Sequence, residues 1–248
     1  MIPNIKQLQK FYASPLGKIA HKNLQKQIIS LTGDVRAKRV LTIGFTTPYL
    51  DFILKDAERI INIFPPQMGA FAWPKNSPSK SVLSDLLELP LNDASIDIII
   101  AVHAFEYVAD SEELMREIWR IAAPNASLIV VVPRRHGLWA QRDNTPFGSG
   151  HPFSKSQLDS LLRIHSFIPK TCSDALFLLP SNSPFWLKLS PILEKVFRLF
   201  GGTFAGAMCV KAKKQLFPAV PRRKKHQRLV KIPALKPQTA FELPKKQS

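Results

Sequence analysis

Cysteine is nearly missing from this 248-residue sequence, which has only two. Cys172 and Cys209 sit among apolar residues and form no C-x-x-C pair. Disulfide frameworks and zinc sites need more thiols at closer spacing. We therefore interpret both as buried thiols of a reducing compartment, and we expect neither a disulfide nor a metal site.

Long apolar runs are missing too. The longest stretch without a charged residue, 60–74, is interrupted by Asn62 and three prolines, whereas a membrane-spanning helix needs roughly 18 or more apolar residues. Near the start, Lys6 and Lys10 are not followed by the apolar core of a signal peptide. These absences predict a cytoplasmic protein with no transmembrane segment.

Acidic residues are scarce at one end of the chain. The formal net charge is +17, and residues 211–248 carry twelve Lys or Arg against a single acid, Glu242. The part before them is therefore only mildly basic. Five prolines and the run RRKKHQR, with few large apolar side chains, predict that 213–248 is a disordered tail. A polycation of this kind is expected to bind nucleic acid weakly and without sequence preference.

Short apolar runs alternate with helical patterns through the rest of the chain. Such alternation predicts an α/β fold with a parallel sheet covered on both faces. The runs IDIIIAV and SLIVVV are apolar on both faces, which is typical of buried parallel strands. The expected strands are 39–43, 59–63, 81–83, 96–102 and 127–132, with helices at 48–57 and 111–121 between them.

The two ends of this domain follow different patterns. At the start, apolar residues at helical spacing predict one or two helices, with Ser14 and Pro15 opening a helix and Gly33 ending one. We therefore expect an N-terminal helical segment over 1–36 and one domain over 37–212. Toward the end we expect helices over 154–168 and 184–200, and strands over 174–180 and 205–214.

Three stretches then suggest a family. VLTIGFTTPYL, SDLLELPLNDASIDIIIAVHAFEYV and LMREIWRIAAPNASLIVVVP follow one another at family-like separations. Residues 35–213 resemble the class I S-adenosylmethionine-dependent methyltransferases, in particular the type 11 methyltransferase family. The resemblance implies a Rossmann-like, seven-stranded, mostly parallel sheet with helices on both faces and an antiparallel last strand. It also implies methyl transfer from S-adenosylmethionine by in-line displacement.

The resemblance places the cofactor at the first loop and after the next strands. Glycines of the family loop are replaced by Thr46 and Pro48, and the acid that would accept from the ribose hydroxyls is replaced by Phe64. Glycine in such loops lets the backbone approach the ligand closely. The residues that the resemblance assigns to cofactor binding are Thr42, Gly44, Phe45, Phe64, Asp85, Leu86 and His103.

The stretch after the fifth strand, VPRRHGLWAQRDNTPFGSGHPFSKSQL, combines arginines with aromatic residues. We interpret it as a lid in which Arg134, Arg135 and Trp139 bind an anionic acceptor, since a guanidinium suits a carboxylate or phosphate. The alternative is that both arginines pair with Glu106 and Asp143 and only pin the loop.

The catalytic chemistry stays open at this point. The histidines that could act as a general base are His103, His136 and His151. The altered loop also leaves two other hypotheses: an inactive methyltransferase-like binding protein, or an RNA-associated protein that uses the basic tail.

Overall fold

The computed structural model describes residues 2–142, 145–181, 183–186, 189 and 205–216. Most of the helix predicted over 184–200 lies outside these residues, and so does nearly all of the predicted tail. The description below concerns the described part alone.

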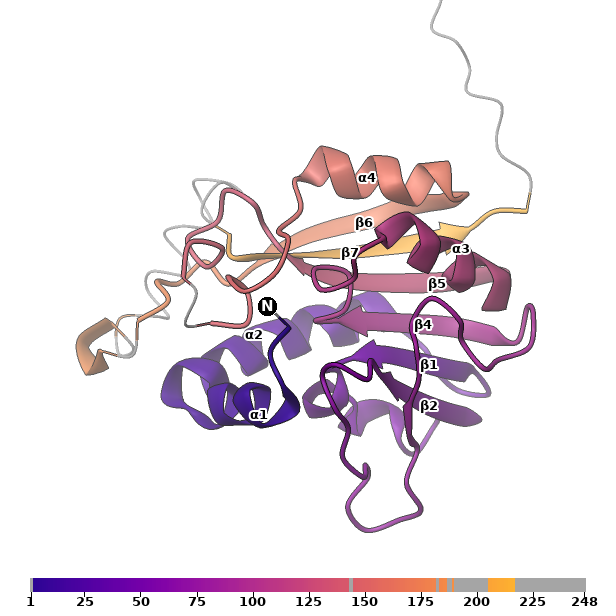
Figure 1. Cartoon of the computed structure of the whole chain (residues 1–248), viewed down its shortest axis with the longest axis horizontal. Coiled ribbons are helices and arrows are strands. Elements are labelled where there is room, and N and C mark those ends of the chain that lie inside the picture. The colour runs from indigo at the N-terminus through magenta and orange to yellow at the C-terminus, as the bar shows by residue number, and fades with distance from the viewer. Residues whose placement is uncertain (1, 143–144, 182, 187–188, 190–204, 217–248) are drawn as a thin grey trace, which may run out of the picture. The chain divides into compact units, whose positions relative to one another are not determined.

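A seven-stranded sheet forms the centre of the fold, with the order β3-β2-β1-β4-β5-β7-β6 (Figure 1). The strands β3, β2, β1, β4 and β5 pair in parallel with their neighbours. The strand β7 pairs antiparallel with both β5 and β6. This confirms the predicted Rossmann-like fold. The strands are β1 (Arg39–Gly44), β2 (Arg59–Phe64), β3 (Ser81–Leu83), β4 (Ile96–Val102), β5 (Ala122–Pro133), β6 (Phe167–Ala175) and β7 (Ala207–Lys214).

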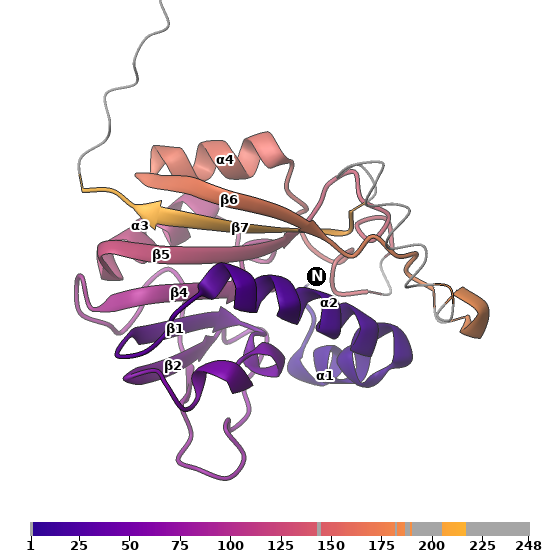
Figure 2. The ribbon, with the colours of Figure 1, turned by 180° about the vertical axis from the view of Figure 1, so that it is seen from behind.

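Helices cover both faces of the sheet. On one face lie α1 (Ile5–Ala13) and α2 (Pro15–Thr32), and on the other lie α3 (Ser111–Ile121) and α4 (Lys155–Ile164) (Figure 2). The predicted start at Ser14 is confirmed, because its side chain accepts from the backbone N–H of Gly17 and Pro15 occupies the first helical turn. This corner places α1 beside the first loop of the sheet.

Three predicted boundaries were wrong. The helix expected over 48–57 is two short 3₁₀ helices, η1 (Thr47–Tyr49) and η2 (Asp51–Ile53), neither of which has a side-chain cap at its start. The helix expected to reach 168 ends at Ile164, because Ser166 adopts a left-handed φ of 59°. The strand expected over 174–180 lies at 167–175, and Leu176, with φ of 61°, turns the chain out of the sheet.

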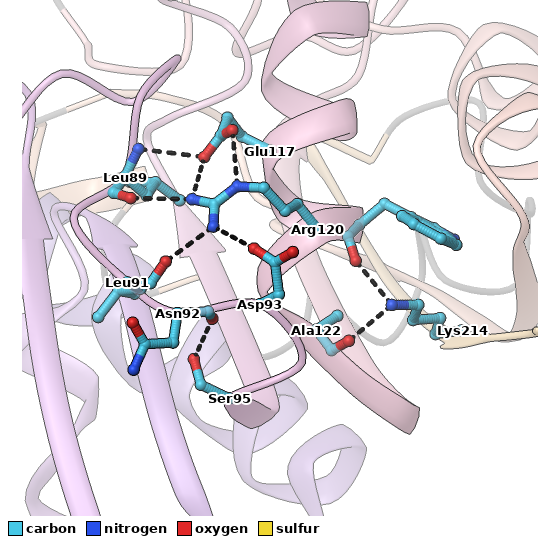
Figure 3. A network of polar contacts seen from close by, with 10 residues as sticks. Leu89, Leu91, Asn92, Asp93, Ser95, Glu117, Arg120, Ala122 and Lys214 are labelled. Atoms are coloured by element: carbon cyan, nitrogen blue, oxygen red, sulfur yellow. Dashed lines mark hydrogen bonds and ion pairs between the residues drawn. The ribbon is translucent and has the colours of Figure 1, made fainter.

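An arginine network fixes the loop between β3 and β4, which carries Asp85 and Leu86. Arg120 of α3 donates to the carbonyls of Leu89 and Leu91 and pairs with Glu117 and Asp93 (Figure 3). Glu117 in turn accepts from the backbone N–H of Leu89. Two carbonyls and one N–H of the loop form hydrogen bonds with side chains of α3. The helix therefore holds this loop against the sheet.

Nearby, β7 is tied to the same helix. The Lys214 ammonium donates to the carbonyls of Trp119 and Ala122 at 2.7 and 2.6 Å and lies over the Trp119 ring. Its residue is 4% exposed. The strand ends at Lys214, as predicted, and this lysine satisfies carbonyls at the end of α3.

Candidate functional site

The first loop closes tightly on the neighbouring strand. Gly44 ends β1 with φ of 83°, and a Cβ there would lie 2.3 Å from the carbonyl oxygen of Val102. The next residue, Phe45, donates its N–H to that same carbonyl at 2.9 Å. Only glycine fits this position, because both the positive φ and the close approach exclude a side chain. The loop therefore keeps one essential glycine.

A hydrogen-bonded trio supports the first loop and includes Thr46, which replaces a family glycine. The hydroxyls of Thr42 and Thr46 both donate to the side-chain oxygen of Asn62 on β2, each at 2.7 Å. All three residues are fully buried. The Asn62 amide nitrogen has no partner among the described residues, and neither does the hydroxyl of Thr47. Buried polar atoms without partners are rare in folded proteins, so the loop is suited to a polar ligand.

A buried relay lies at the end of β4. The Nδ1 atom of His103 is 3.0 Å from the carboxylate of Glu106, and its Nε2 atom is 2.7 Å from the hydroxyl of Tyr12. An ionised carboxylate can only accept, so Nδ1 donates to Glu106 and the neutral ring accepts at Nε2 from Tyr12. His103 holds this position with a left-handed φ of 52°, a strained conformation for a residue with a side chain.

Tyr12 itself was missed by the sequence analysis. It lies at a helical spacing among apolar residues, which is the pattern of an ordinary core position. In the structure its ring stacks on Phe45, with centroids 5.4 Å apart and planes 20° apart. Burial raises the pKa of the Tyr12 phenol well above its usual value. The group therefore stays protonated and donates to His103.

Two cavities lie on either side of this relay. The larger, the Glu106 cavity, has a volume of about 760 Å³ and lies between the start of α1, the β4 loop and residues 145–151. The smaller, the first-loop cavity, has about 260 Å³ and is lined by Tyr12, Phe45 and Phe71 among others. Glu106 lines one cavity and Tyr12 lines the other, with His103 buried between them.

The residues that the sequence assigned to cofactor binding differ in their exposure. Phe64 is fully buried and packs on Phe71 at 5.5 Å. Leu86 is buried. Asp85 is exposed, and one of its oxygens accepts from the backbone N–H of Leu87. Among these described residues, Asp85 is the one with a charged and exposed side chain.

The expected lid residues are not gathered around the Glu106 cavity. The Arg134 guanidinium forms an ion pair with Asp174 of β6 at 2.5 Å, rather than with Glu106. Arg135 is exposed and lines a separate hollow over α4. Trp139 is a core residue, fully buried with its Nε1 donating to the carbonyl of Leu178.

The three candidate histidines are also separated. His103 has both ring nitrogens engaged, while His136 is exposed and lines neither cavity. His151 lines the Glu106 cavity, and its backbone N–H donates to the Glu106 carbonyl. The structure therefore brings His103 and His151 to one region and leaves His136 outside it.

The described residues contain no cluster of three or more His, Cys, Asp or Glu side chains that could hold a metal ion. Within the same residues, every helix is too short or too polar to cross a membrane.

The cofactor expected from the resemblance fits this site in part. Gly44 allows close backbone approach, Asp85 offers a carboxylate, and two unpartnered polar atoms lie at the loop. The first-loop cavity is smaller than most ligand sites, which measure roughly 300–1,000 Å³. The Tyr12 ring forms part of its wall.

Comparison with known proteins agrees with this architecture. Residues 42–130 match a family model described as a methyltransferase domain. Ajmaline N-methyltransferase of Rauvolfia serpentina is 32% identical over 76 residues, which cover 29% of this chain and 26% of that protein. The chain thus spans about a quarter of the length of that curated relative.

Solved structures share the whole fold. An S-adenosylmethionine-dependent methyltransferase of Thermotoga maritima aligns with a TM-score of 0.60 at 16% identity, over 85% of this chain and 96% of that one. Geranyl diphosphate methyltransferase, solved in complex with S-adenosylmethionine, aligns with a TM-score of 0.54 at 12% identity, over 77% and 84%. By its strand order, this chain has the Rossmann-like fold of the class I S-adenosylmethionine-dependent methyltransferases, and residues 42–130 match the methyltransferase-domain model.

Proposed function

We propose that this protein transfers a methyl group from S-adenosylmethionine to an acceptor held in the Glu106 cavity. The observation that carries the proposal is the pair of cavities at the carboxyl ends of β1 and β4, separated by the Tyr12–His103–Glu106 relay. In open α/β sheets this edge is where ligands bind. The family match over residues 42–130 supports the same edge.

On this proposal the first-loop side holds the cofactor. Gly44, the backbone at Phe45, Asp85 and Leu86 would bind it, with Phe64 beside the adenosine. Thr42 would act indirectly. It is fully buried and supports the loop through its hydrogen bond to Asn62, without contacting the ligand. When bound, the cofactor supplies a methyl group on a sulfonium centre. Holding two partners in line is then the main task of the protein.

The relay would move the proton that an acceptor must lose. Neither ring nitrogen of His103 is free, so the relay group that lines the acceptor cavity is Glu106. As the acceptor attacks the methyl group, its proton would pass to the Glu106 carboxylate. Tyr12, whose raised pKa keeps it protonated, would hold the His103 ring in place from the other side.

Calorimetric titration with S-adenosylmethionine tests the first half of this proposal. We expect binding that is roughly ten- to a hundredfold weaker than in a site with a ribose carboxylate, equivalent to about 1.5–3 kcal/mol. Asp85→Ala should weaken it further, whereas Asp56→Ala, a change at another exposed acid, should not. No binding at millimolar cofactor, with Asp85→Ala identical to the unmodified protein, would leave the chain a methyltransferase-like binding protein.

A further inference from the structure

The charge of the Glu106 cavity is opposite to that of the protein. Of the twelve described residues that line it, Glu106 is the one whose side chain has a formal charge at neutral pH. These twelve include no Lys or Arg, although the chain carries a net charge of +17. The two arginines that the sequence assigned to an anionic acceptor point elsewhere, one to Asp174 and one to the hollow over α4.

The Glu106 carboxylate is also incompletely satisfied. Its residue is 1% exposed, and its Oε1 atom has one partner, the Nδ1–H of His103. Its Oε2 atom has no hydrogen-bond partner among the described residues. A buried carboxylate is costly unless paired and hydrogen-bonded, and the histidine contact satisfies one oxygen alone. The free oxygen needs a donor, and a cation is the strongest donor available to it.

Aromatic faces complete the lining. Phe11 of α1 and Tyr107 of the β4 loop both line the cavity, together with Ile2, Pro3 and Pro146. Apolar and aromatic walls suit the carbon skeleton of an organic ligand, and aromatic rings attract a cation through their faces. At about 760 Å³ the cavity has room for a ligand of some size.

From these features we propose that the Glu106 cavity binds a protonated organic amine, with its ammonium group on Oε2 of Glu106. This deepens the proposed function, because it names the acceptor class of the same site. Glu106 would then hold the acceptor with one oxygen, which also takes the ammonium proton so that the nitrogen lone pair can attack the methyl group, and would orient His103 with the other. An anion at this position would lie beside a buried negative charge.

Three probes of one shape test the proposal: 2-phenylethylammonium, neutral 2-phenylethanol and anionic phenylacetate. Each is titrated calorimetrically into the full chain without cofactor at about 0.15 M salt, where charges beyond roughly 8 Å are screened. We expect the ammonium to bind at least tenfold tighter than the alcohol, and the carboxylate more weakly than both. Equal binding of ammonium and alcohol, or tightest binding of the carboxylate, overturns the proposal.

Variants then locate the effect. Glu106→Gln keeps the shape of the side chain and should remove the preference for ammonium over alcohol. If this variant does not fold, Gln7→Lys decides instead, because Gln7 lines the same cavity and an added cation there should weaken ammonium binding several-fold. Gln9→Lys is its control on the same helix, since Gln9 lines the first-loop cavity. An unchanged preference in Gln7→Lys, or an equal loss in both, contradicts the proposal.

Because no cofactor is present, these titrations do not depend on methyl transfer. If the protein does not bind S-adenosylmethionine but clearly prefers the ammonium probe, the proposed function is refuted and the amine site stands. Cofactor binding with no charge preference would do the reverse.

Discussion

The hydroxyl of Tyr12 lies 2.7 Å from Nε2 of His103, across 91 positions of sequence. This contact joins α1 to the end of β4, and both residues are buried. The N-terminal helix is therefore bonded to the centre of the candidate site. Its contribution can be measured through stability as well as through activity.

Tyr12→Phe should lower the free energy of unfolding by about 1–2 kcal/mol, because it leaves the buried Nε2 of His103 without a partner. Thr47→Val is the control. The Thr47 hydroxyl is buried and has no hydrogen-bond partner among the described residues, so its removal should be neutral or slightly stabilising. Urea unfolding of the two variants measures the difference. Equal losses would show that the relay contributes nothing.

Arg120→Met should cost about 2–3 kcal/mol, because two carbonyls of the β3–β4 loop and the Glu117 carboxylate lose their donor. Arg163→Met is the comparison. That arginine makes an exposed pair with Asp159 one helical turn away, and pairs of this kind contribute roughly 0.5 kcal/mol or less. Thermal melts of both variants give the result. If Arg120→Met is as mild as its comparison, α3 does not hold the loop.

Asp97 should make stability depend on acid pH. Its hydrogen bonds to the Arg39 side chain, 58 positions away, hold its pKa below the usual 3.8. A carboxyl with a depressed folded pKa stabilises the protein above its unfolded pKa, and that contribution is lost as pH falls through the folded pKa. Asp97→Asn should therefore flatten the decline of unfolding free energy below about pH 4.

Asp34 serves as the control for this pH series. Its pKa is also lowered, by Arg36, but the two residues are only two positions apart and their pair is exposed. Such a local pair also forms in the unfolded chain, so it cancels in the folding equilibrium. Asp34→Asn should leave the acid decline close to that of the unmodified protein. A larger change in Asp34→Asn than in Asp97→Asn would reverse the assignment.

Phe64→Asp, which restores a carboxylate on β2, should now carry a cost. Phe64 is fully buried, so the change should lose roughly 3–5 kcal/mol from the missing ring and the buried charge. Phe64→Ala loses the ring alone. If the carboxylate accepts from the ribose, S-adenosylmethionine should raise the melting temperature of Phe64→Asp more than that of Phe64→Ala. Equal shifts would place the ribose elsewhere.

Local patterns in the sequence predicted the sheet well and the site only partly. The bounds of β3, β4 and α3 were predicted residue for residue, because period and apolar content are local properties. Ser166 and Leu176 moved two boundaries through left-handed φ values, which no residue type there announces. The relay was out of reach for another reason. It depends on α1 folding back onto β4, which is not a local property of the sequence. A tyrosine among apolar residues also has the pattern of an ordinary core residue.

The antiparallel direction of β7 decides where the chain leaves the domain. Ala207 pairs with Pro133 near the site, and Lys213 pairs with Ser127, which lies beside Ile98 near the start of β4. The described chain therefore continues to Leu216 past the end of β7 that lies away from Pro133 (Figure 1). A fluorophore on a cysteine placed at Leu216, which is 52% exposed, would report tumbling and surface immobilisation while leaving ligand access to the opposite rim unobstructed.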